Sequence, residues 1–257
     1  MKNKYRSKFK KELKIINYIT TTEIYRLVFL LTILLGLYGG FVLGSPKGDF
    51  VNSLLTPLSF PIFNILLFSI IFLNNINTCS ILKKNFPDYI LRLGNKKKYV
   101  RTIVIITTLM YLYHFTIIML FILMPLLITT LSSFKIETFQ FYGISNLTYL
   151  LFYVIRYAIY GLLITIISSL IYINTNTKVT LIINSLFLLL MYYFGGMVSF
   201  RTGFSILIWS YFTTTVYSSF SIDVASSVFM LLILEIIVLM VSHLSYKNRR
   251  LEILWNI

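Results

Sequence analysis

Long apolar runs constrain this chain more than any other feature of its sequence. A helix that crosses roughly 30 Å of hydrocarbon needs about 20 mostly apolar residues. Runs that meet or approach this length lie at 26–44, 57–76, 102–131, 149–173, 179–200 and 226–246. Hydrophobic residues make up 58% of the 257 positions, which is more apolar surface than one soluble core could bury. We therefore predict an all-α membrane protein whose six transmembrane helices fill a domain of residues 26–246.

Further expectations concern the third run and the connections between the runs. The third run is longer than one crossing requires and has Pro125 near its far end, so we expect it to tilt, kink or continue beyond the lipid. The connections 45–56 and 132–148 are modest outer loops, and 174–178 is a tight turn that makes the fourth and fifth runs an antiparallel pair.

The basic residues predict which side of the membrane holds the termini. With six spans both termini lie on one side, and 19 of the 23 Lys and Arg residues fall in the segments on that side. The exceptions are Lys47, Lys135, Arg156 and Arg201. Because Lys and Arg concentrate in cytoplasmic segments, both termini are predicted to be cytoplasmic, including the tail 247–257. A net charge of +15 placed in this way favours a membrane location over nucleic-acid binding.

The first 25 residues have the pattern of an amphipathic helix at the inner membrane surface. Apolar side chains recur there at steps of four and three while lysines occupy the other sides. The apolar positions are Tyr5, Phe9, Leu13, Ile16 and Ile19. The alternative is a basic tail that only sets topology, with apolar residues that are incidental.

The connection between the last two runs, residues 201–225, differs from the other outer loops. It is too apolar for a free loop and too interrupted by Ser, Thr and Gly for a span. We expect short re-entrant helices that dip into the outer leaflet, because irregular backbone at that depth needs protein or a cavity around it. Its most prominent aromatic residues are Phe204, Trp209, Tyr211 and Phe212.

The usual motifs of enzymes are missing from the sequence. We find no phosphate-binding loop, no paired metal-ligand motif and no nucleophile elbow. The only histidines, His114 and His243, lie on different spans, and the single Cys79 lies at the cytoplasmic end of the second span, where no disulfide is expected. We predict a chain that is not an enzyme and holds no cofactor or metal of its own.

Three ionisable residues lie well inside the apolar runs, away from their ends, namely His114, Arg156 and Glu235. Charge in hydrocarbon is costly, so such residues are candidates for function. At about 1.5 Å per residue, all three fall near one depth. Arg156 and Glu235 are predicted either to form an ion pair that holds the bundle together or to face a substrate cavity.

The layout of basic N-terminal helix, six spans, basic inner loop and semi-buried outer segment resembles the permease subunits of ABC exporters of the second exporter class, which have the type V fold. Two segments carry the most specific likeness. RLGNKKKY, residues 92–99, resembles the R-x-G-[S/N]-[R/K]-[R/K] run of small permeases from low-GC Gram-positive bacteria, and YKNRRLEIL follows the last span. The resemblance covers nearly the whole chain and implies a bacterial cell membrane.

The resemblance implies that the inner loop 77–101 couples this chain to a separate ATPase, which binds ATP and Mg²⁺. A coupling helix would lie within 77–94, and the basic run after it enforces topology and binds anionic lipid. The expected ATPase contacts are Phe86, Pro87, Asp88, Tyr89 and Arg92. The family also implies a second permease, either another copy or a related chain, and an outer gate formed by the aromatic residues of segment 201–225.

The expected substrate is an amphipathic peptide such as a bacteriocin, a lantibiotic or a phenol-soluble modulin. Lipids, polysaccharides and drugs are the alternatives within the family. A membrane scaffold or sensor without transport activity is the alternative from another class, and a secondary transporter is weakened by the absence of a visible repeat.

Overall fold

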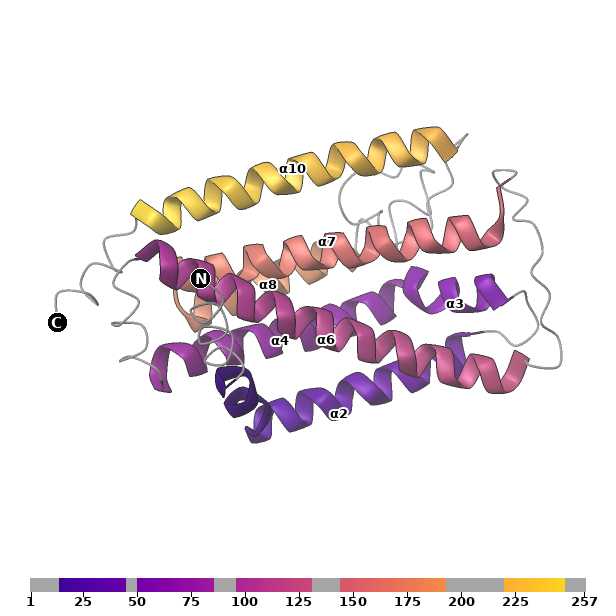
Figure 1. The fold of residues 1–257 in the computed structure, drawn as a ribbon, viewed down its shortest axis with the longest axis horizontal. Helices are drawn as coiled ribbons and strands as arrows, with labels where there is room; N and C mark the ends of the chain where they lie inside the picture. The colour runs from indigo at the N-terminus through magenta and orange to yellow at the C-terminus, as the bar shows by residue number, and fades with distance from the viewer. Residues whose placement is uncertain (1–13, 45–49, 86–95, 131–143, 193–219, 248–257) are drawn as a thin grey trace, which may run out of the picture.

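The computed structural model describes residues 14–44, 50–85, 96–130, 144–192 and 220–247. The elements of these parts are helices, which confirms the all-α prediction (Figure 1). They are α2 (Glu23–Tyr38), the π-helix η1 (Gly39–Leu43), α3 (Phe50–Ser59), α4 (Pro61–Asn85), α6 (Lys96–Thr130), α7 (Asn146–Asn174), α8 (Thr177–Tyr192) and α10 (Phe220–Lys247).

Five of the helical segments are long and apolar enough to cross a membrane. They are Glu23–Leu43, Ile62–Lys83, Lys97–Ile128, Thr148–Asn174 and Phe220–Ser245. They correspond to the first, second, third, fourth and sixth predicted runs. For the fifth run the structure describes α8, whose apolar part Thr177–Leu190 is shorter, and residues 193–200 lie outside the described residues. A membrane crossing by the fifth predicted run, which would be the sixth span of the chain, therefore stays a prediction.

Several helix boundaries differ from the predicted ones near the two ends of the bundle. α3 already occupies much of the predicted outer loop 45–56 and is separated from α4 at Phe60, because Pro61 opens the new helix. α4 continues through residues 77–85, which the sequence assigned to the inner loop. α10 begins at Phe220, six residues before the predicted start of the sixth span.

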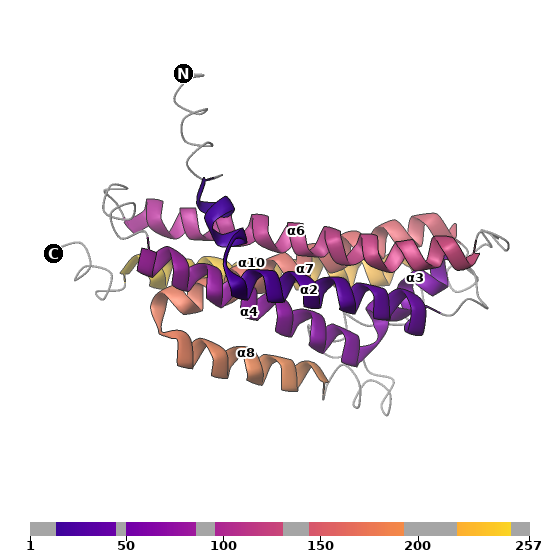
Figure 2. The same ribbon diagram turned by 90° about the horizontal axis from the view of Figure 1, so that it is seen from below.

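The helices lie side by side along the long axis of the molecule and alternate in direction (Figure 1). The start of α2 and the end of α10 lie at the same end of the bundle. α4, α6 and α7 pack against one another at its centre, whereas α10 lies at one edge and packs chiefly against α7. Figure 2 shows α8 at another edge, where it packs against α4 and α7.

The described part of the N-terminal segment packs against the bundle. Residues 14–20 are helical, and Ile15 and Ile19 are 3% and 0% exposed among residues of α4, α6 and α7. Three consecutive threonines then end this helix, because their hydroxyls donate to carbonyl oxygens three residues earlier. The predicted amphipathic pattern over residues 1–13 lies outside the described residues.

A row of glycines allows close contact between α2 and α6. Gly36 and Gly40 face α6, and a methyl group on Gly40 would lie 2.7 Å from the carbonyl oxygen of Ile122 and 2.8 Å from Cγ of Pro125. Glycine at steps of four lets two helix backbones approach closely inside a membrane. The contact also supports α6 where Pro125, inside the helix, removes one backbone hydrogen bond.

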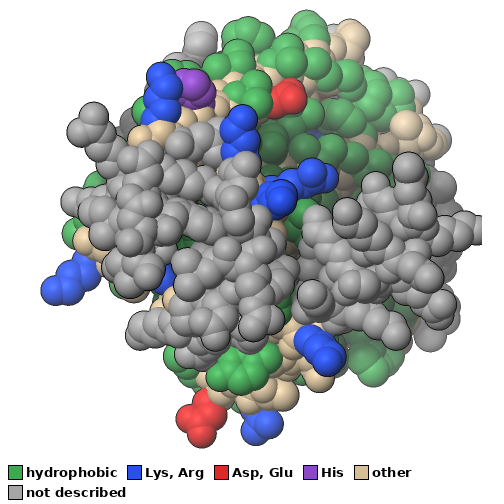
Figure 3. Space-filling view, turned by 60° about the vertical axis from the view of Figure 1, so that its left-hand side comes forward, with side chains coloured by type: hydrophobic (Ala, Val, Ile, Leu, Met, Phe, Trp, Pro, Cys, Tyr) green, Lys and Arg blue, Asp and Glu red, His purple; other side chains and the backbone are tan. Residues whose placement is uncertain are grey.

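The described basic residues gather at one end of the bundle. Apart from Arg156, they are exposed and lie close to the helix ends on this side. Those whose side chains the structure describes are Lys14, Arg26, Lys83, Lys97, Lys98, Arg101, Lys178 and Lys247. Figure 3 views the molecule with this end forward and shows Lys and Arg side chains around its rim. At the opposite end, the residues that the structure describes include no Lys or Arg, so the charge asymmetry of the sequence is also an asymmetry of the fold.

Candidate functional site

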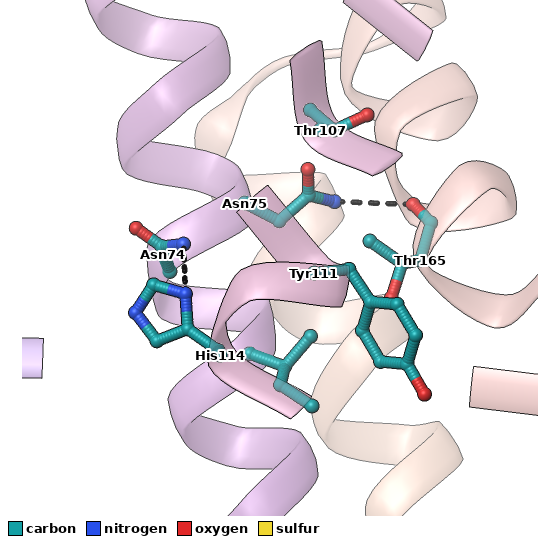
Figure 4. Close-up of a pocket in the computed structure, with 7 residues that line it drawn as sticks. Asn74, Asn75, Thr107, Tyr111, His114 and Thr165 are labelled. Carbon is teal, nitrogen blue, oxygen red and sulfur yellow. Dashed lines mark hydrogen bonds between the residues drawn. The ribbon is translucent and has the colours of Figure 1, made fainter. Parts of the chain in front are cut away.

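A cluster of polar side chains lies at the centre of the bundle, where α4, α6 and α7 meet (Figure 4). α4 contributes Asn74 and Asn75, and α6 contributes residues at steps of four and three that share one face of the helix. The members from α6 are Thr107, Tyr111 and His114, and those from α7 are Thr165 and Ser169. The seven side chains are at most 4% exposed.

Asn75 and Ser169 join the three helices by hydrogen bonds. The side-chain amide of Asn75 donates to the backbone carbonyl of Thr165 at 3.2 Å. The hydroxyl of Ser169 lies 3.0 Å from Oδ1 of Asn75 and 3.1 Å from Oγ1 of Thr107. Hydrogen bonds of this kind hold helices together where burial of apolar surface supplies little driving force.

Within this cluster, His114 and Asn74 each have a buried polar atom without a hydrogen-bond partner among the described residues. Nδ1 of His114 lies 2.9 Å from the carbonyl oxygen of Met110, an arrangement in which this nitrogen carries the proton and donates it. The Asn74 amide nitrogen lies 3.4 Å from the same nitrogen. Nε2 of His114 and Oδ1 of Asn74 have no hydrogen-bond partner in the described structure. Two buried acceptors therefore remain for a group that can donate hydrogen bonds.

A small cavity lies beside these side chains. It is lined by Ile71, Asn74, Asn75, Thr107, Tyr111, His114 and Thr165. About 10 Å³ is open to the centre of a water molecule, which is room for about one water. The cavity is thus large enough for a hydrogen-bonding solvent molecule and far too small for a peptide or a lipid.

A second polar site joins α7 to α10. Nη1 of Arg156 donates to Oδ1 of Asp223 at 2.7 Å and lies 3.4 Å from Oγ of Ser227. The Arg156 and Asp223 side chains are 2% and 0% exposed. The guanidinium also lies 5.3 Å from the ring centre of Phe152 and 4.9 Å from that of Tyr153. Asp223 lies in the first turn of α10, where the helix dipole favours negative charge.

The structure corrects the predicted pairing of Arg156 with Glu235. The partner of Arg156 is Asp223, twelve residues earlier on the same helix, and the Glu235 side chain is exposed. Long side chains on a helix lean toward its N-terminus, so Arg156 reaches toward the end of α7 at which α10 begins. That direction brings it to Asp223 and away from Glu235.

The three ionisable residues singled out by the sequence are not brought together. His114 contacts Asn74 and the ring of Tyr25, whereas Arg156 belongs to the α7–α10 pair and Glu235 to the outward face of α10. The other predicted site residues lie outside the described residues. These are the coupling residues Phe86, Pro87, Asp88, Tyr89 and Arg92 and the outer-gate residues Phe204, Trp209, Tyr211 and Phe212.

Further polar contacts make α7 the most cross-linked of the described helices. The Tyr160 hydroxyl donates to the Ser227 carbonyl at 2.8 Å, and the Asn174 amide donates to Ser245 Oγ at 2.6 Å. Tyr157 donates to the side chain of Asn64 on α4 at 2.5 Å, and Asn184 on α8 donates to Ser168 at 3.0 Å. Together with the hydrogen bond from Ser169 to Thr107 on α6, these contacts bond α7 to four neighbouring helices, through side chains that sequence inspection passed over.

No group of three or more His, Cys, Asp or Glu side chains lies close enough to hold a metal ion within the described parts of the chain. Comparison with protein-family models, with curated proteins and with solved structures finds no match to this chain.

Proposed function

We propose that this chain is a permease subunit of an ATP-driven ABC exporter in a bacterial cell membrane. The observation that carries the proposal is the geometry of the charged end. α4 continues as a helix to Asn85 and α6 begins at Lys96, so residues 86–95, the middle of the predicted coupling loop 77–101, connect two long helices at that end. Exposed cations flank it, namely Lys83, Lys97, Lys98 and Arg101.

This arrangement suits mechanical coupling between the segment and the bundle. α4 and α6 pack against α7 and against each other through the central polar cluster, so a displacement of residues 86–95 would act directly on the helices at the centre. The energy would come from ATP hydrolysis in a separate subunit that binds ATP and Mg²⁺. A second permease would complete the transporter.

The proposed substrate is an amphipathic peptide, and lipids, polysaccharides and drugs are the alternatives. The cavity beside His114 has room for about one water and cannot hold such a substrate. We propose that the substrate moves along the surface of this bundle, in the space between this chain and the second permease.

The test is to purify the tagged protein in mild detergent from its native membrane and to identify what remains bound. We expect a stoichiometric partner that carries a phosphate-binding loop. The double variant Phe86→Ala/Tyr89→Ala is expected to lose it, because these aromatic side chains are the proposed contacts. The matched control, Phe204→Ala/Tyr211→Ala, removes two aromatic side chains of the predicted outer segment 201–225 and should keep the partner.

Two results would contradict the proposal. If the protein is purified alone, or with a partner that has no nucleotide site, the scaffold or sensor hypothesis is favoured instead. If both double variants lose the partner equally, the coupling segment is not the site of contact.

A further inference from the structure

Buried polar atoms without a hydrogen-bond partner are concentrated on α2, α4 and α6. No residue that the structure describes bonds to them, and four of the five residues that carry them are at most 4% exposed. The atoms are the Tyr25 hydroxyl, Oδ1 of Asn74, Nδ2 of Asn77, Oγ1 of Thr78 and Nε2 of His114. Buried polar groups in native proteins are almost always bonded to protein or to ordered water. This concentration therefore indicates a bound ligand that can form hydrogen bonds.

Contacts between the three helices bring the five residues into one region. The Asn74 amide nitrogen lies 3.4 Å from Nδ1 of His114, which joins α4 to α6. The ring of Tyr25 on α2 meets the His114 ring edge-on, with 5.4 Å between their centres. Asn77 and Thr78 lie three and four residues after Asn74, so they share its side of α4 one turn closer to the charged end.

The cavity beside Asn74 and His114 limits the size of the ligand. About 10 Å³ is open to the centre of a water molecule, which is room for about one water. In Figure 4, the free nitrogen of His114 and the side-chain oxygen of Asn74 lie on the same side of the contact between the two residues. One water placed there could donate to both acceptors.

The chemistry of the five atoms favours water over a cation. Nε2 of His114 and Oδ1 of Asn74 need a donor, the Asn77 amide needs an acceptor, and the two hydroxyls can do either. Water donates and accepts, whereas a metal ion or an ammonium group could not bond to the amide of Asn77. No carboxylate of the described residues bonds to any of these atoms, so the charge of a cation would be uncompensated.

We propose that ordered water fills this site and extends along α4 from His114 past Thr78 to the charged end. Toward the opposite end of α4, polar side chains are bonded to protein instead. The amide of Asn64 donates to the Leu58 carbonyl at 2.8 Å, and its oxygen accepts from Tyr157. The water path therefore ends at His114 and makes the centre of the bundle reachable from one side only.

The site lies between the two helices that flank residues 86–95. Water-mediated hydrogen bonds are nearly as favourable as direct ones. Because single waters can exchange, α4 and α6 could shift past each other here without breaking a direct bond between their side chains. The inference goes beyond the proposed function and does not depend on it, since the site would be hydrated whether or not an ATPase binds. The two proposals can therefore fail separately.

The first test is hydroxyl-radical footprinting of the unmodified protein in detergent by short X-ray pulses. Radicals form from bound water as well as from bulk water, so a buried side chain beside ordered water is oxidised. Tyr25 is expected to be oxidised several-fold faster than Tyr157 and Tyr160. These two are also buried, but their hydroxyls bond to protein. His114 should be oxidised as well, although it is 1% exposed. Mass spectrometry of the peptides measures the rates.

The second test asks from which side the water enters. Thr78→Cys, in a Cys79→Ala background, is treated with Ag⁺ in chloride-free buffer, and the thiols that remain free are counted with a maleimide after denaturation. We expect Ag⁺ to block Thr78→Cys in vesicles that present the charged end and not in vesicles of the opposite orientation. The matched control is Leu73→Cys on the same helix, whose 50% exposed side chain should face lipid and stay free.

Three outcomes would overturn the proposal. Oxidation of Tyr25 no faster than that of Tyr157 and Tyr160 would mean that the site is dry. Blocking of Leu73→Cys as strong as that of Thr78→Cys would mean that Ag⁺ arrives through the lipid. Blocking of Thr78→Cys from the opposite side, or from neither, would contradict the path along α4. Elution volume in detergent checks that Thr78→Cys folds, and Asn77→Cys replaces it if it does not.

Discussion

At the scale of single residues, the ion pair between Arg156 and Asp223 is a costly arrangement, because both charges are buried. Both side chains are withdrawn from solvent, and their attraction offsets a large desolvation penalty only while both are present. Removal of one partner leaves an uncompensated charge between α7 and α10. The pair is therefore more sensitive to single substitutions than to joint replacement.

We predict that Arg156→Met or Asp223→Leu alone lowers the free energy of unfolding by about 3–5 kcal/mol. The double variant should recover most of this loss, because neither charge remains buried. Thermal unfolding of the purified protein in detergent measures the effect. Equal losses in the single and double variants would contradict this account, and Glu235→Gln serves as the control that leaves the pair intact.

Gly161 on α7 makes room for a tyrosine of α6. The Tyr111 hydroxyl donates to the Ala158 carbonyl at 3.1 Å, and a methyl group on Gly161 would overlap that hydroxyl. We predict that Gly161→Ala lowers the unfolding free energy by about 1–3 kcal/mol through overpacking. Added to Tyr111→Phe, the same change should cost less, because the hydroxyl is gone. Strictly additive losses in thermal unfolding would refute the clash.

At the scale of helices, the glycine row holds α2 against α6 through backbone contact. Gly40 meets the Ile122 carbonyl and the ring of Pro125, neither of which can rotate away as a flexible side chain would. The contact lies in the π-helix η1, where the Gly44 amide donates five residues back to Gly39 at 2.8 Å. Two irregular backbone segments thus support each other.

We predict that Gly40→Ala separates α2 from α6 locally and reduces stability by about 1–3 kcal/mol. The control is Val42→Ala on the same π-helix, whose side chain is 63% exposed and whose truncation should change little. Thermal unfolding in detergent compares the two variants. A larger loss in Val42→Ala than in Gly40→Ala would show that the glycine contact is not the one that matters.

Sequence periodicity predicted the helices well but placed their ends less accurately. The length of the apolar runs located five candidate spans, because a helix that crosses lipid needs an apolar run regardless of which helices pack against it. It ended the second run at residue 76 and began the sixth at 226, so Asn75 fell at a margin and Asp223 in a loop. Polar residues near the ends of apolar runs lower the mean hydropathy although the helix continues. For this reason Asn75 and Asp223 were not recognised as members of the two polar sites.

The partners of buried polar groups were harder to predict than the groups themselves. Arg156 and His114 could be identified because ionisable residues are rare in apolar runs. Their partners come from other helices and depend on rotation and depth, which one sequence does not specify. A polar residue within three positions of an apolar run, such as Asp223 before the sixth run or Asn77 after the second, is the signal that could have extended those helices.

At the scale of the whole molecule, the charged end gives the bundle a polarity along its axis. Lys97 and Lys98 lie at one end of α6, whereas Ser145 lies just before α7 at the other. If the charged end is cytoplasmic, each position is accessible from one side of the membrane only.

We predict that Lys98→Cys reacts with a membrane-impermeant maleimide only in inside-out vesicles and that Ser145→Cys reacts only in intact cells. The parent protein is the control, since its buried Cys79 should not react from either side. The opposite pattern would invert the topology, and equal reactivity of both positions from one side would contradict the described arrangement of α6 and α7.

The separation of Arg156 and Asp223 along the chain has a consequence for biosynthesis. The two residues are 67 positions apart, so the fourth span leaves the ribosome well before its counter-charge exists. Until α10 is made, the guanidinium must stay near the translocon or bind water and lipid phosphate. Lateral release of α7 is therefore expected to wait for α10, and a chain cut short before residue 220 would present quality-control proteases with an unneutralised arginine.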